Sequence, residues 1–171
     1  MALFKFLNGK GRYHDDNARE TVVEYILNPY KARHGYIGGG YVNMENVESI
    51  VGSMNKVAQE FGKVNGVQLR HFVISFLPQE TRDPYMVYQI GGQITMAICL
   101  EYQTVFAVHE DTDNLHIHLM LNSISHQDGH RYAGTRKDYY TLVNCIGKVL
   151  RQHGIRKLIP VSYSSGQDIQ E

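Results

Sequence analysis

The chain of 171 residues has no tryptophan, only two cysteines and no long apolar run. Cys99 and Cys145 fall in separate predicted helices without the spacing of metal ligands, so we expect reduced core residues and no disulfide framework. No apolar run approaches the roughly 18 residues of a membrane-spanning helix. Residues 1–7 lack the hydrophobic region and cleavage site of a signal peptide. These absences predict a cytoplasmic protein without membrane insertion.

The chain also lacks a charge excess, because its 17 basic residues balance 17 acidic ones. This balance by itself argues against a nucleic-acid partner. The charges are nevertheless segregated: residues 126–160 hold seven basic and two acidic residues, and residues 40–125 hold four basic and nine acidic ones. Such segregation fits a phosphate-binding side and acids near a cation. A solvated basic helix explains it almost as well.

Length and composition predict one globular domain over residues 1–160, with residues 161–171 as a polar tail or the start of a linker. Hydrophobic periodicity predicts helices at 17–27, 45–61, 83–100 and 138–153, and strands at 3–7, 69–77, 104–109 and 115–122. The last two strands are close enough in sequence to form an antiparallel hairpin. We therefore expect an α+β fold, with a mainly antiparallel sheet of about five strands and helices packed on one face.

Three local signals refine these boundaries. Asn17 and Glu20 have the spacing of a capping box at the start of the first helix. Asp83 followed by Pro84 is a helix start with Asp as N-cap. The Gly38–Gly40 run is expected in a turn or at a strand edge, and no Gly-Lys-Ser/Thr follows that would make it a phosphate loop.

The run from His109 to Asn122 contains three histidines and alternates between polar and apolar residues in its second half. On a strand, His116 and His118 share one face, opposite the apolar residues. His109 ends the preceding strand of the expected hairpin and so lies beside them. Three imidazoles that converge in this way can bind one divalent ion. A surface strand with unrelated histidines is the alternative, and the added His109 favours the metal site.

A metal held by three neutral histidines keeps positions open for water or substrate oxygens. It can generate hydroxide, or act as a Lewis acid on a phosphoryl group. In the second case a tyrosine oxygen can attack the phosphodiester and form a covalent link. The chain has twelve tyrosines, most of which we expect to serve packing or the surface.

Three segments resemble the motifs of the HUH endonucleases, and more narrowly of relaxases, the mobilisation nucleases of the MobA/VirD2-like class. The histidine run resembles the third motif. Residues 23–31, Val-Glu-Tyr-Ile-Leu-Asn-Pro-Tyr-Lys, resemble the first motif, which carries the nucleophilic tyrosine. Residues 71–76, His-Phe-Val-Ile-Ser-Phe, resemble the second. The motifs occur in the expected order, and the resemblance spans residues 5–155.

The resemblance implies that Tyr25 attacks the scissile phosphate of single-stranded transfer-origin DNA and forms a 5′-phosphotyrosine link. The reaction would begin conjugative transfer or mobilisation of a plasmid or integrative element. The three histidines would hold Mn²⁺ or Mg²⁺, with zinc or nickel possible in the isolated protein because imidazole is a soft ligand for magnesium. Accessory relaxosome proteins and a coupling protein are the implied partners. Tyr30 and Tyr36 are alternative nucleophiles.

Further residues receive roles from the resemblance or from their position. Asp111 is a candidate proton acceptor or an orienting partner of a ligand histidine, with a turn-stabilising carboxylate as the alternative. Asn122 is expected to support the histidine strand. The expected DNA contacts, each with a structural or solvated alternative, are Ser75, His71, Arg131, Arg136 and Lys137.

Three other functions stay open. Rolling-circle replication initiators and single-tyrosine transposases of the HUH class generally carry the tyrosine after the histidine motif, and Tyr139 and Tyr140 keep that possibility. A metal-dependent hydrolase would act through activated water without a covalent intermediate. A non-catalytic DNA-binding module would use the histidines only for its fold.

Overall fold

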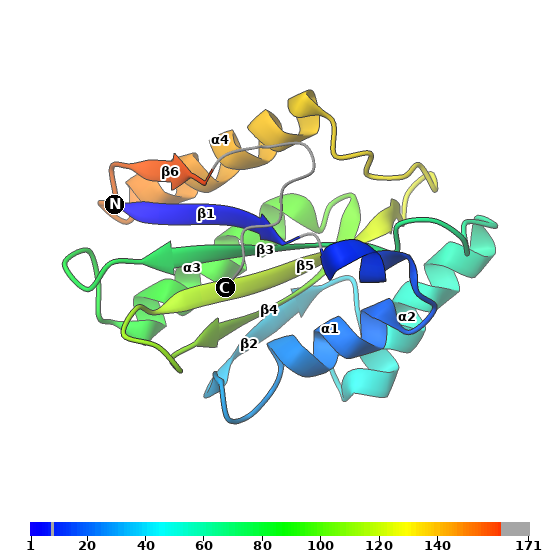
Figure 1. The fold of residues 1–171 in the computed structure, drawn as a ribbon, viewed down its shortest axis with the longest axis horizontal. Helices are drawn as coiled ribbons and strands as arrows, with labels where there is room; N and C mark the ends of the chain where they lie inside the picture. Colours follow the sequence, from blue (N-terminus) through cyan, green and yellow to red (C-terminus); the bar gives the residue numbers. More distant parts are fainter. Residues whose placement is uncertain (8, 162–171) are drawn as a thin grey trace.

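A computed structural model describes residues 1–7 and 9–161; the expected tail at 161–171 lies outside the described residues except for Val161. The structure is built around one six-stranded sheet with the strand order β2-β4-β5-β3-β1-β6 (Figure 1). All neighbouring strands pair antiparallel except β1 and β6, which pair parallel. The prediction of an α+β fold with a mainly antiparallel sheet is therefore confirmed.

The sequence places most elements within a few residues of their observed bounds. The strands are β1 (Ala2–Leu7), β2 (Ala32–Gly40), β3 (Leu69–Phe76), β4 (Tyr102–His109), β5 (His116–Ser125) and β6 (Leu158–Pro160). The helices are the 3₁₀ helix η1 (Gly9–His14) and the α-helices α1 (Ala18–Ile26), α2 (Val47–Glu60), α3 (Pro84–Ile98) and α4 (Arg136–Gln152). None of the helices in the described part of the chain is long and apolar enough to cross a membrane.

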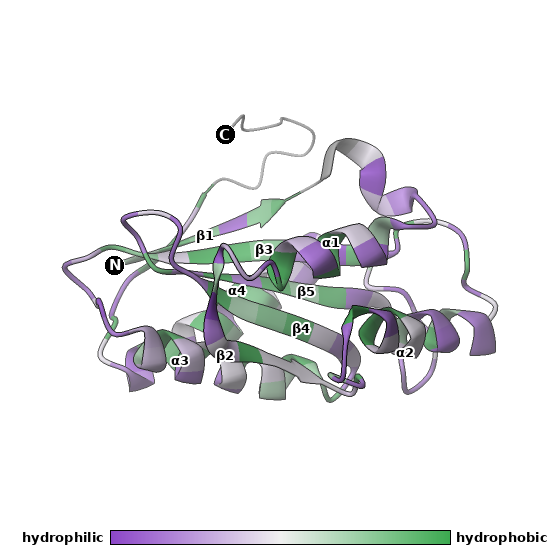
Figure 2. Cartoon of the chain, turned by 90° about the horizontal axis from the view of Figure 1, so that it is seen from below, coloured by the Kyte–Doolittle hydropathy of each residue, from purple (hydrophilic) through white to green (hydrophobic). Residues whose placement is uncertain are grey.

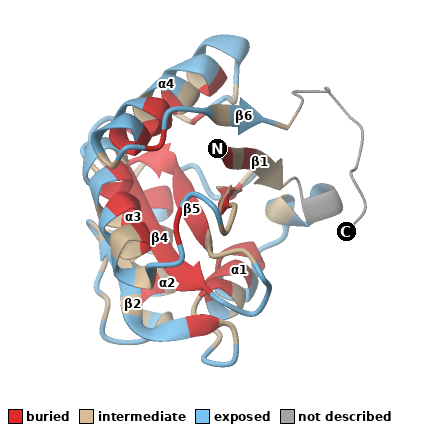
Figure 3. Cartoon of the chain, turned by 90° about the vertical axis from the view of Figure 1, so that its left-hand side faces the viewer, coloured by how far each residue is buried: buried red, intermediate tan, exposed pale blue. Residues whose placement is uncertain are grey.

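Helices cover both faces of the sheet, so the prediction of helices on a single face is wrong. On one face, α3 and α4 bury the apolar sides of β1, β3, β4 and β5 around Phe72, Phe106 and Ile117. On the other face, α1 and α2 pack on Val105 and Met120. The histidine face therefore also carries apolar residues, and these bury the apolar stripes of α1 and α2. Figure 2 shows α1 and α3 on opposite sides of the sheet. The coverage leaves β4 and β5 as buried strands inside the sheet (Figure 3).

The glycine run lies at the end of β2, an edge strand that the sequence indicated only as a turn or strand edge. A Cβ at Gly39 would lie 2.8 Å from the Thr104 backbone oxygen, and one at Gly40 would lie 2.3 Å from the Cys99 Cβ. Glycine therefore permits the close approach of β2 to β4 and to the end of α3. Cys99 and Cys145 are half-buried rather than core residues, and both thiols are free.

The two predicted N-cap residues differ in whether their side chains cap the helix, and a third helix has a cap that was not predicted from the sequence. Asp83 caps α3 as predicted, because its side chain accepts a hydrogen bond from the Tyr85 backbone. Asn17 occupies the N-cap of α1 but makes no side-chain cap bond, so the expected capping box is absent there. A capping box forms instead between Thr135 and Asp138 at the start of α4.

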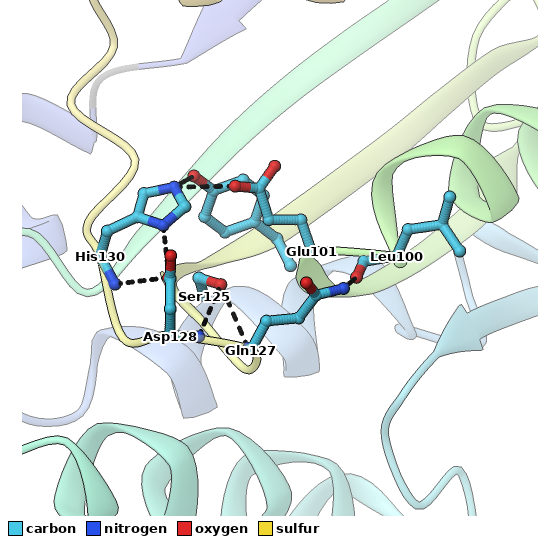
Figure 4. A network of polar contacts seen from close by, with 7 residues as sticks. Leu100, Glu101, Ser125, Gln127, Asp128 and His130 are labelled. Carbon is cyan, nitrogen blue, oxygen red and sulfur yellow. Dashed lines mark hydrogen bonds and ion pairs between the residues drawn. The ribbon is translucent and has the colours of Figure 1, made fainter.

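A polar network closes the end of the β4–β5 hairpin that is remote from His109 and His116 (Figure 4). The Nε2 atom of His130 lies 2.8 Å from a Glu101 oxygen, and its Nδ1 atom lies 2.5 Å from an Asp128 oxygen. The Gln127 side chain donates to the backbone carbonyl of Leu100. Both ring nitrogens of His130 are thus occupied, and we assign this network to the structure of the hairpin.

Candidate active site

The register of the β4–β5 hairpin brings the three histidines together. His109 pairs with His116, and Ala107 pairs with His118, so all three imidazoles lie on the face covered by α1. One ring nitrogen from each histidine lies within 4.8 Å of the other two. The sequence prediction that these three side chains converge is met by this geometry.

Backbone carbonyls determine which nitrogen of two histidines carries a proton. His109 Nε2 lies 2.8 Å from the carbonyl oxygen of Ile26, one of the last carbonyls of α1. His116 Nδ1 lies 2.9 Å from the carbonyl oxygen of Asn114. A carbonyl can only accept, so both of these nitrogens are N–H donors, and each ring keeps a lone pair on its other nitrogen.

His109 has a buried ring nitrogen without a hydrogen-bond partner in the described part of the chain, as expected of a side chain that binds a metal ion. His109 is fully buried, and its Nδ1 atom has no hydrogen-bond partner among the described residues. Burial lowers the pKa of His109 and thus favours the neutral ring that metals require. A set of neutral imidazole nitrogens fits Mn²⁺, Zn²⁺ or Ni²⁺ better than Mg²⁺.

His118 is held by another histidine instead of a carbonyl. Its Nδ1 atom lies 2.9 Å from His71 Nε2, and His71 Nδ1 lies 3.0 Å from the Tyr13 hydroxyl. Burial lowers the pKa of His71 to about 3 and also depresses the pKa of His118, so both rings are neutral. His71 is 3% exposed. The structure thus places His71 beneath the histidine cluster, where its contact is to a candidate ligand; the expected DNA contact does not fit this burial.

Tyr25 lies at the C-terminal end of α1, directly over the histidines. Its ring centroid is 5.1 Å from that of His118, 5.8 Å from that of His109 and 6.1 Å from that of His71. The bond from His109 to Ile26 joins the same helix end to β4. Tyr25 is half-buried, which leaves part of the side chain open to a substrate.

The other candidate nucleophiles lie elsewhere. Tyr30 is 93% exposed. Tyr36 packs against Tyr88, beside the apolar cluster on the face of the sheet opposite the histidines. Tyr139 packs on Phe4 on that same opposite face, and Tyr140 follows it on α4. The structure therefore brings Tyr25 together with the histidines and does not favour the reading in which an α4 tyrosine is the nucleophile.

Lys31 and Asp111 border the site on the side of β2. The Lys31 Nζ atom lies 4.5 Å from the Tyr25 ring centroid and 3.8 Å from an Asp111 oxygen. The other Asp111 oxygen is 3.4 Å from Nε2 of His116. Asp111 is thus beside a candidate ligand, and Lys31 connects it to Tyr25.

Asn122 ties the histidine strand to three neighbouring elements. Its side-chain oxygen accepts two bonds from the buried Arg19 of α1, at 2.9 and 3.1 Å. Its amide donates to Gln103 of β4 at 2.9 Å and to the backbone of Met54 in α2. Burial lowers the pKa of Arg19 to about 10, yet the guanidinium stays charged at neutral pH. This geometry fits the structural support expected of Asn122.

The remaining expected DNA contacts separate into two groups. Ser75 pairs with His116 across β3 and β5, on the histidine face, and is half-buried beside the site. Arg131 donates to the backbone carbonyls of Lys63, Asn65 and Val67, so its guanidinium holds a loop. The structure does not bring Arg136 or Lys137 to the site: both are exposed at the start of α4, which packs on the opposite face.

Sequence reasoning missed the roles of Tyr13, Lys31 and Arg19. Lys31 falls inside the segment that resembles the first motif, so its position was available as a signal. Tyr13 lies in a glycine-rich stretch that predicts only a turn, and Arg19 looks like an ordinary helix residue. Their contacts join residues 58 and 103 positions apart, which local patterns do not encode.

Comparison with known proteins gives one family match and several relatives. The family described as "Relaxase: MobA/VirD2-like, nuclease domain" matches residues 25–155. Protein rlx of Staphylococcus aureus is 27% identical over 95 residues, which are 56% of this chain and 30% of the relative. Protein TraI of Escherichia coli is 32% identical over 88 residues, which are 51% of this chain and 12% of the relative.

The Group II intron-interrupted relaxase LtrB of Lactococcus lactis subsp. cremoris is 27% identical over 88 residues, 51% of this chain and 16% of the relative. The chain thus spans less than a third of the length of these curated relatives. A solved structure described as "Molecular Basis of Vancomycin Resistance Transfer in Staphylococcus aureus" matches with a TM-score of 0.52 and 14% identity, over 95% of this chain and 98% of that chain. This likeness shows a shared fold. The family match covers well over half of the chain, which therefore belongs to the MobA/VirD2-like relaxase nuclease-domain family.

Proposed function

We propose that this domain nicks single-stranded transfer-origin DNA through a covalent link to Tyr25, and so begins conjugative transfer or mobilisation of a plasmid or integrative element. The observation that carries the proposal is the position of the Tyr25 ring over the rings of His109, His118 and His71. A nucleophile and a set of neutral nitrogen ligands next to each other are the two halves of a tyrosine–metal transesterase.

In the proposed step, the Tyr25 oxygen attacks the scissile phosphorus and the bond from phosphorus to the 3′ oxygen breaks. The products are a 5′-phosphotyrosine and a free 3′-hydroxyl, which takes up a proton. Asp111 is the proposed acceptor of the phenol proton, since it is a carboxylate at the border of the site. Lys31 lies against both the Tyr25 ring and the Asp111 carboxylate and so joins the two. Since one ester bond replaces another, the hydroxyl can later reverse the reaction.

The side chains around Tyr25 would hold the reacting groups in place. His109, His116 and His118 would hold a divalent cation, Mn²⁺ or Mg²⁺ in the cell, which when bound polarises the phosphate oxygens as a Lewis acid. Lys31 adds a positive charge beside the Tyr25 ring and favours the negative charge that develops during attack. The α1 helix end, fixed by His109, keeps the phenol over the cluster.

The part of the histidine face formed by β1 and β3 offers a path for the DNA strand. Lys5 pairs with Val73, and Leu3 pairs with Ser75, so these four residues share the face that carries the histidines. All four are half-buried, and Ser75 is directly beside His116. We assign phosphate contacts to Lys5 and Ser75. Arg136 and Lys137 are left for more distant contacts with DNA or partners.

The proposal includes the cellular setting implied by the family. Accessory relaxosome proteins and a coupling protein are the expected partners, in the cytoplasm. Because the matched part covers only 30% of protein rlx and 12% of protein TraI, these partners can depend on segments beyond this domain.

The test is incubation of the protein with a transfer-origin single strand and Mn²⁺, followed by denaturing gel electrophoresis. We expect a protein–DNA adduct that resists denaturant, and its loss in Tyr25→Phe. This substitution keeps the ring contacts, and the Tyr25 hydroxyl has no hydrogen bond to another described residue, so the fold should be unchanged. Tyr30→Phe is the matched control because that side chain is 93% exposed.

Other outcomes would identify the competing functions. Cleavage without an adduct would indicate a hydrolase that uses activated water. Loss of the adduct in Tyr139→Phe or Tyr140→Phe, with Tyr25→Phe active, would place the nucleophile on α4 as in a replication initiator or transposase. Cleavage by His116→Ala combined with His118→Ala at the unaltered rate would remove the metal centre from the reaction.

A further inference from the structure

His118 differs from the other two candidate ligands in the group that fixes its proton. His109 and His116 each donate to a backbone carbonyl, which cannot donate in return. His118 Nδ1 faces His71 Nε2, and a neutral imidazole nitrogen can be either donor or acceptor. The ability of His118 to bind a cation therefore depends on which way this hydrogen bond points.

The chain Tyr13–His71–His118 has two neutral arrangements. In the first, His118 Nδ1–H donates to His71, and His71 Nδ1–H donates to the Tyr13 oxygen, so His118 Nε2 keeps its lone pair. In the second, the Tyr13 hydroxyl donates to His71 and His71 donates to His118, so His118 Nε2 carries a proton and cannot ligate. The two arrangements hold the same number of protons, and no charge changes.

We propose that Tyr13 and His71 are positioning residues that select the tautomer of His118 able to bind the cation. The inference rests on the metal centre of the proposed function. Groups behind metal-ligating histidines commonly orient the ring and fix its tautomer, and their loss weakens metal binding about 10–100-fold. Here the group behind His118 is His71, which is itself hydrogen-bonded to the phenol of Tyr13. The tautomer of His118 is therefore selected by two residues that do not touch the ion.

The surrounding structure holds the two residues firmly in this role. His71 is 3% exposed on β3, one strand away from His118. The backbone oxygen of Tyr13 accepts a bond from the backbone N–H of Gln68 at 2.7 Å, which fastens η1 to the start of β3. The Tyr13 ring also packs with the apolar cluster beneath α1. Neither side chain is free to turn toward another partner without breaking these contacts.

Substitutions at position 71 separate tautomer selection from packing. Glutamine carries an amide oxygen that can accept from His118 Nδ1–H, so His71→Gln should bind Mn²⁺ within about threefold of the unaltered protein. Methionine fills a similar volume but offers no comparable acceptor, so His71→Met should bind about 10–100-fold more weakly. A role in packing alone predicts the same Mn²⁺ affinity for both variants once they are folded.

Tyr13→Phe tests the far end of the chain. Phenylalanine keeps the ring but removes the acceptor for His71 Nδ1–H, and a buried N–H without a partner is rarely tolerated. We expect weaker Mn²⁺ binding than in the unaltered protein, with Tyr30→Phe unchanged as the control. The measurement is calorimetric titration with Mn²⁺ alone, after circular dichroism has shown that each variant is folded.

Nitrogen-15 NMR of the Zn²⁺-loaded protein gives a second readout that does not depend on affinity. The proposal expects a protonated Nδ1 and an unprotonated Nε2 on His71, and a protonated Nδ1 on His118. A protonated Nε2 on His71 would overturn it, as would equal Mn²⁺ affinity of His71→Met and His71→Gln. If the unaltered protein binds no Mn²⁺, the metal centre of the proposed function fails. If it binds Mn²⁺ and the variants bind equally well, only the selection by Tyr13 and His71 fails.

Discussion

Alanine at the adjacent positions Gly91 and Gly92 of α3 is expected to change stability in opposite directions. A Cβ at Gly91 would lie 2.5 Å from one ring carbon of Phe106 and 2.7 Å from another, whereas a Cβ at Gly92 meets nothing within 4 Å. The Phe106 ring has little room to move away, because its other edge packs closely on Gly38, where a Cβ would lie only 2.5 Å from the ring. The ring is thus confined between α3 and β2 by two glycines.

The magnitudes decide the sign of each effect. Replacing a helical glycine by alanine stabilises by about 0.8–1 kcal/mol. Overpacking a core costs about 1–3 kcal/mol, and the confined ring places Gly91→Ala at the upper end. We expect Gly91→Ala to lower the free energy of unfolding by about 2 kcal/mol and Gly92→Ala to raise it by about 0.5–1 kcal/mol.

Urea denaturation followed by far-ultraviolet circular dichroism measures both variants, since the chain has no tryptophan to report by fluorescence. A difference of about 3 kcal/mol separates the two midpoints by roughly 1–3 M urea. The double variant Gly91→Ala with Phe106→Leu should recover part of the loss, measured against Phe106→Leu alone. The reasoning is refuted if Gly91→Ala is as stable as the unaltered protein, or if both alanines destabilise equally.

Three further predictions concern a cap, a charge and pH. Thr135→Ala should lower the free energy of unfolding by about 1 kcal/mol because the Thr135 side chain caps α4. Asn17→Ala should change it little because the Asn17 side chain makes no cap bond, and urea denaturation of both variants checks the difference. Lys31→Met should slow adduct formation about tenfold without weakening Mn²⁺ binding, because the Lys31 charge stabilises the negative charge that develops on the reacting groups but repels the ion. Gel assays measure the first property and calorimetry the second, with Lys56→Met as the control. A fall in both properties together would contradict the prediction. In the metal-free protein, the depressed pKa of His71, about 3, means that the unfolded chain binds more protons between pH 6.5 and 3, so stability falls as the pH is lowered through that range. His71→Gln should reduce the loss of unfolding free energy between pH 7 and pH 5 by about 2 kcal/mol, measured by urea denaturation at the two pH values. An equal loss in the variant and the unaltered protein would exclude this contribution of His71.

Most elements of the fold could be predicted from the sequence because their signals are local. The helices from Asp83 and near residue 47 follow apolar spacing and caps, and the predicted hairpin follows two short β-rich runs. Strand β2 was harder to recognise because it contains three successive glycines, which are required by the contact with Thr104 and Cys99. Strand β6 has three residues and is defined by its parallel pairing with β1.

The arrangement of layers depends on information that periodicity does not contain. Alternation showed that His116 and His118 share a face, and a polar face suggested solvent. The same face also carries Val105 and Met120, and these residues bury the apolar stripes of α1 and α2. Coverage of the second face is what brings a helix, and with it Tyr25, above the histidines.

The sequence by itself determined the convergence of His109, His116 and His118, because a period of two and a short hairpin fix which side chains share a face. Only the tertiary structure decided which tyrosine lies over them, since packing of α1 places Tyr25 there and leaves Tyr139 on the opposite face. The tertiary structure also decided how the imidazoles are held: the carbonyl of Ile26 holds His109, and the His71 ring holds His118. The physical reason is that side-chain direction along a strand is local, whereas contacts between elements depend on how their buried faces pack.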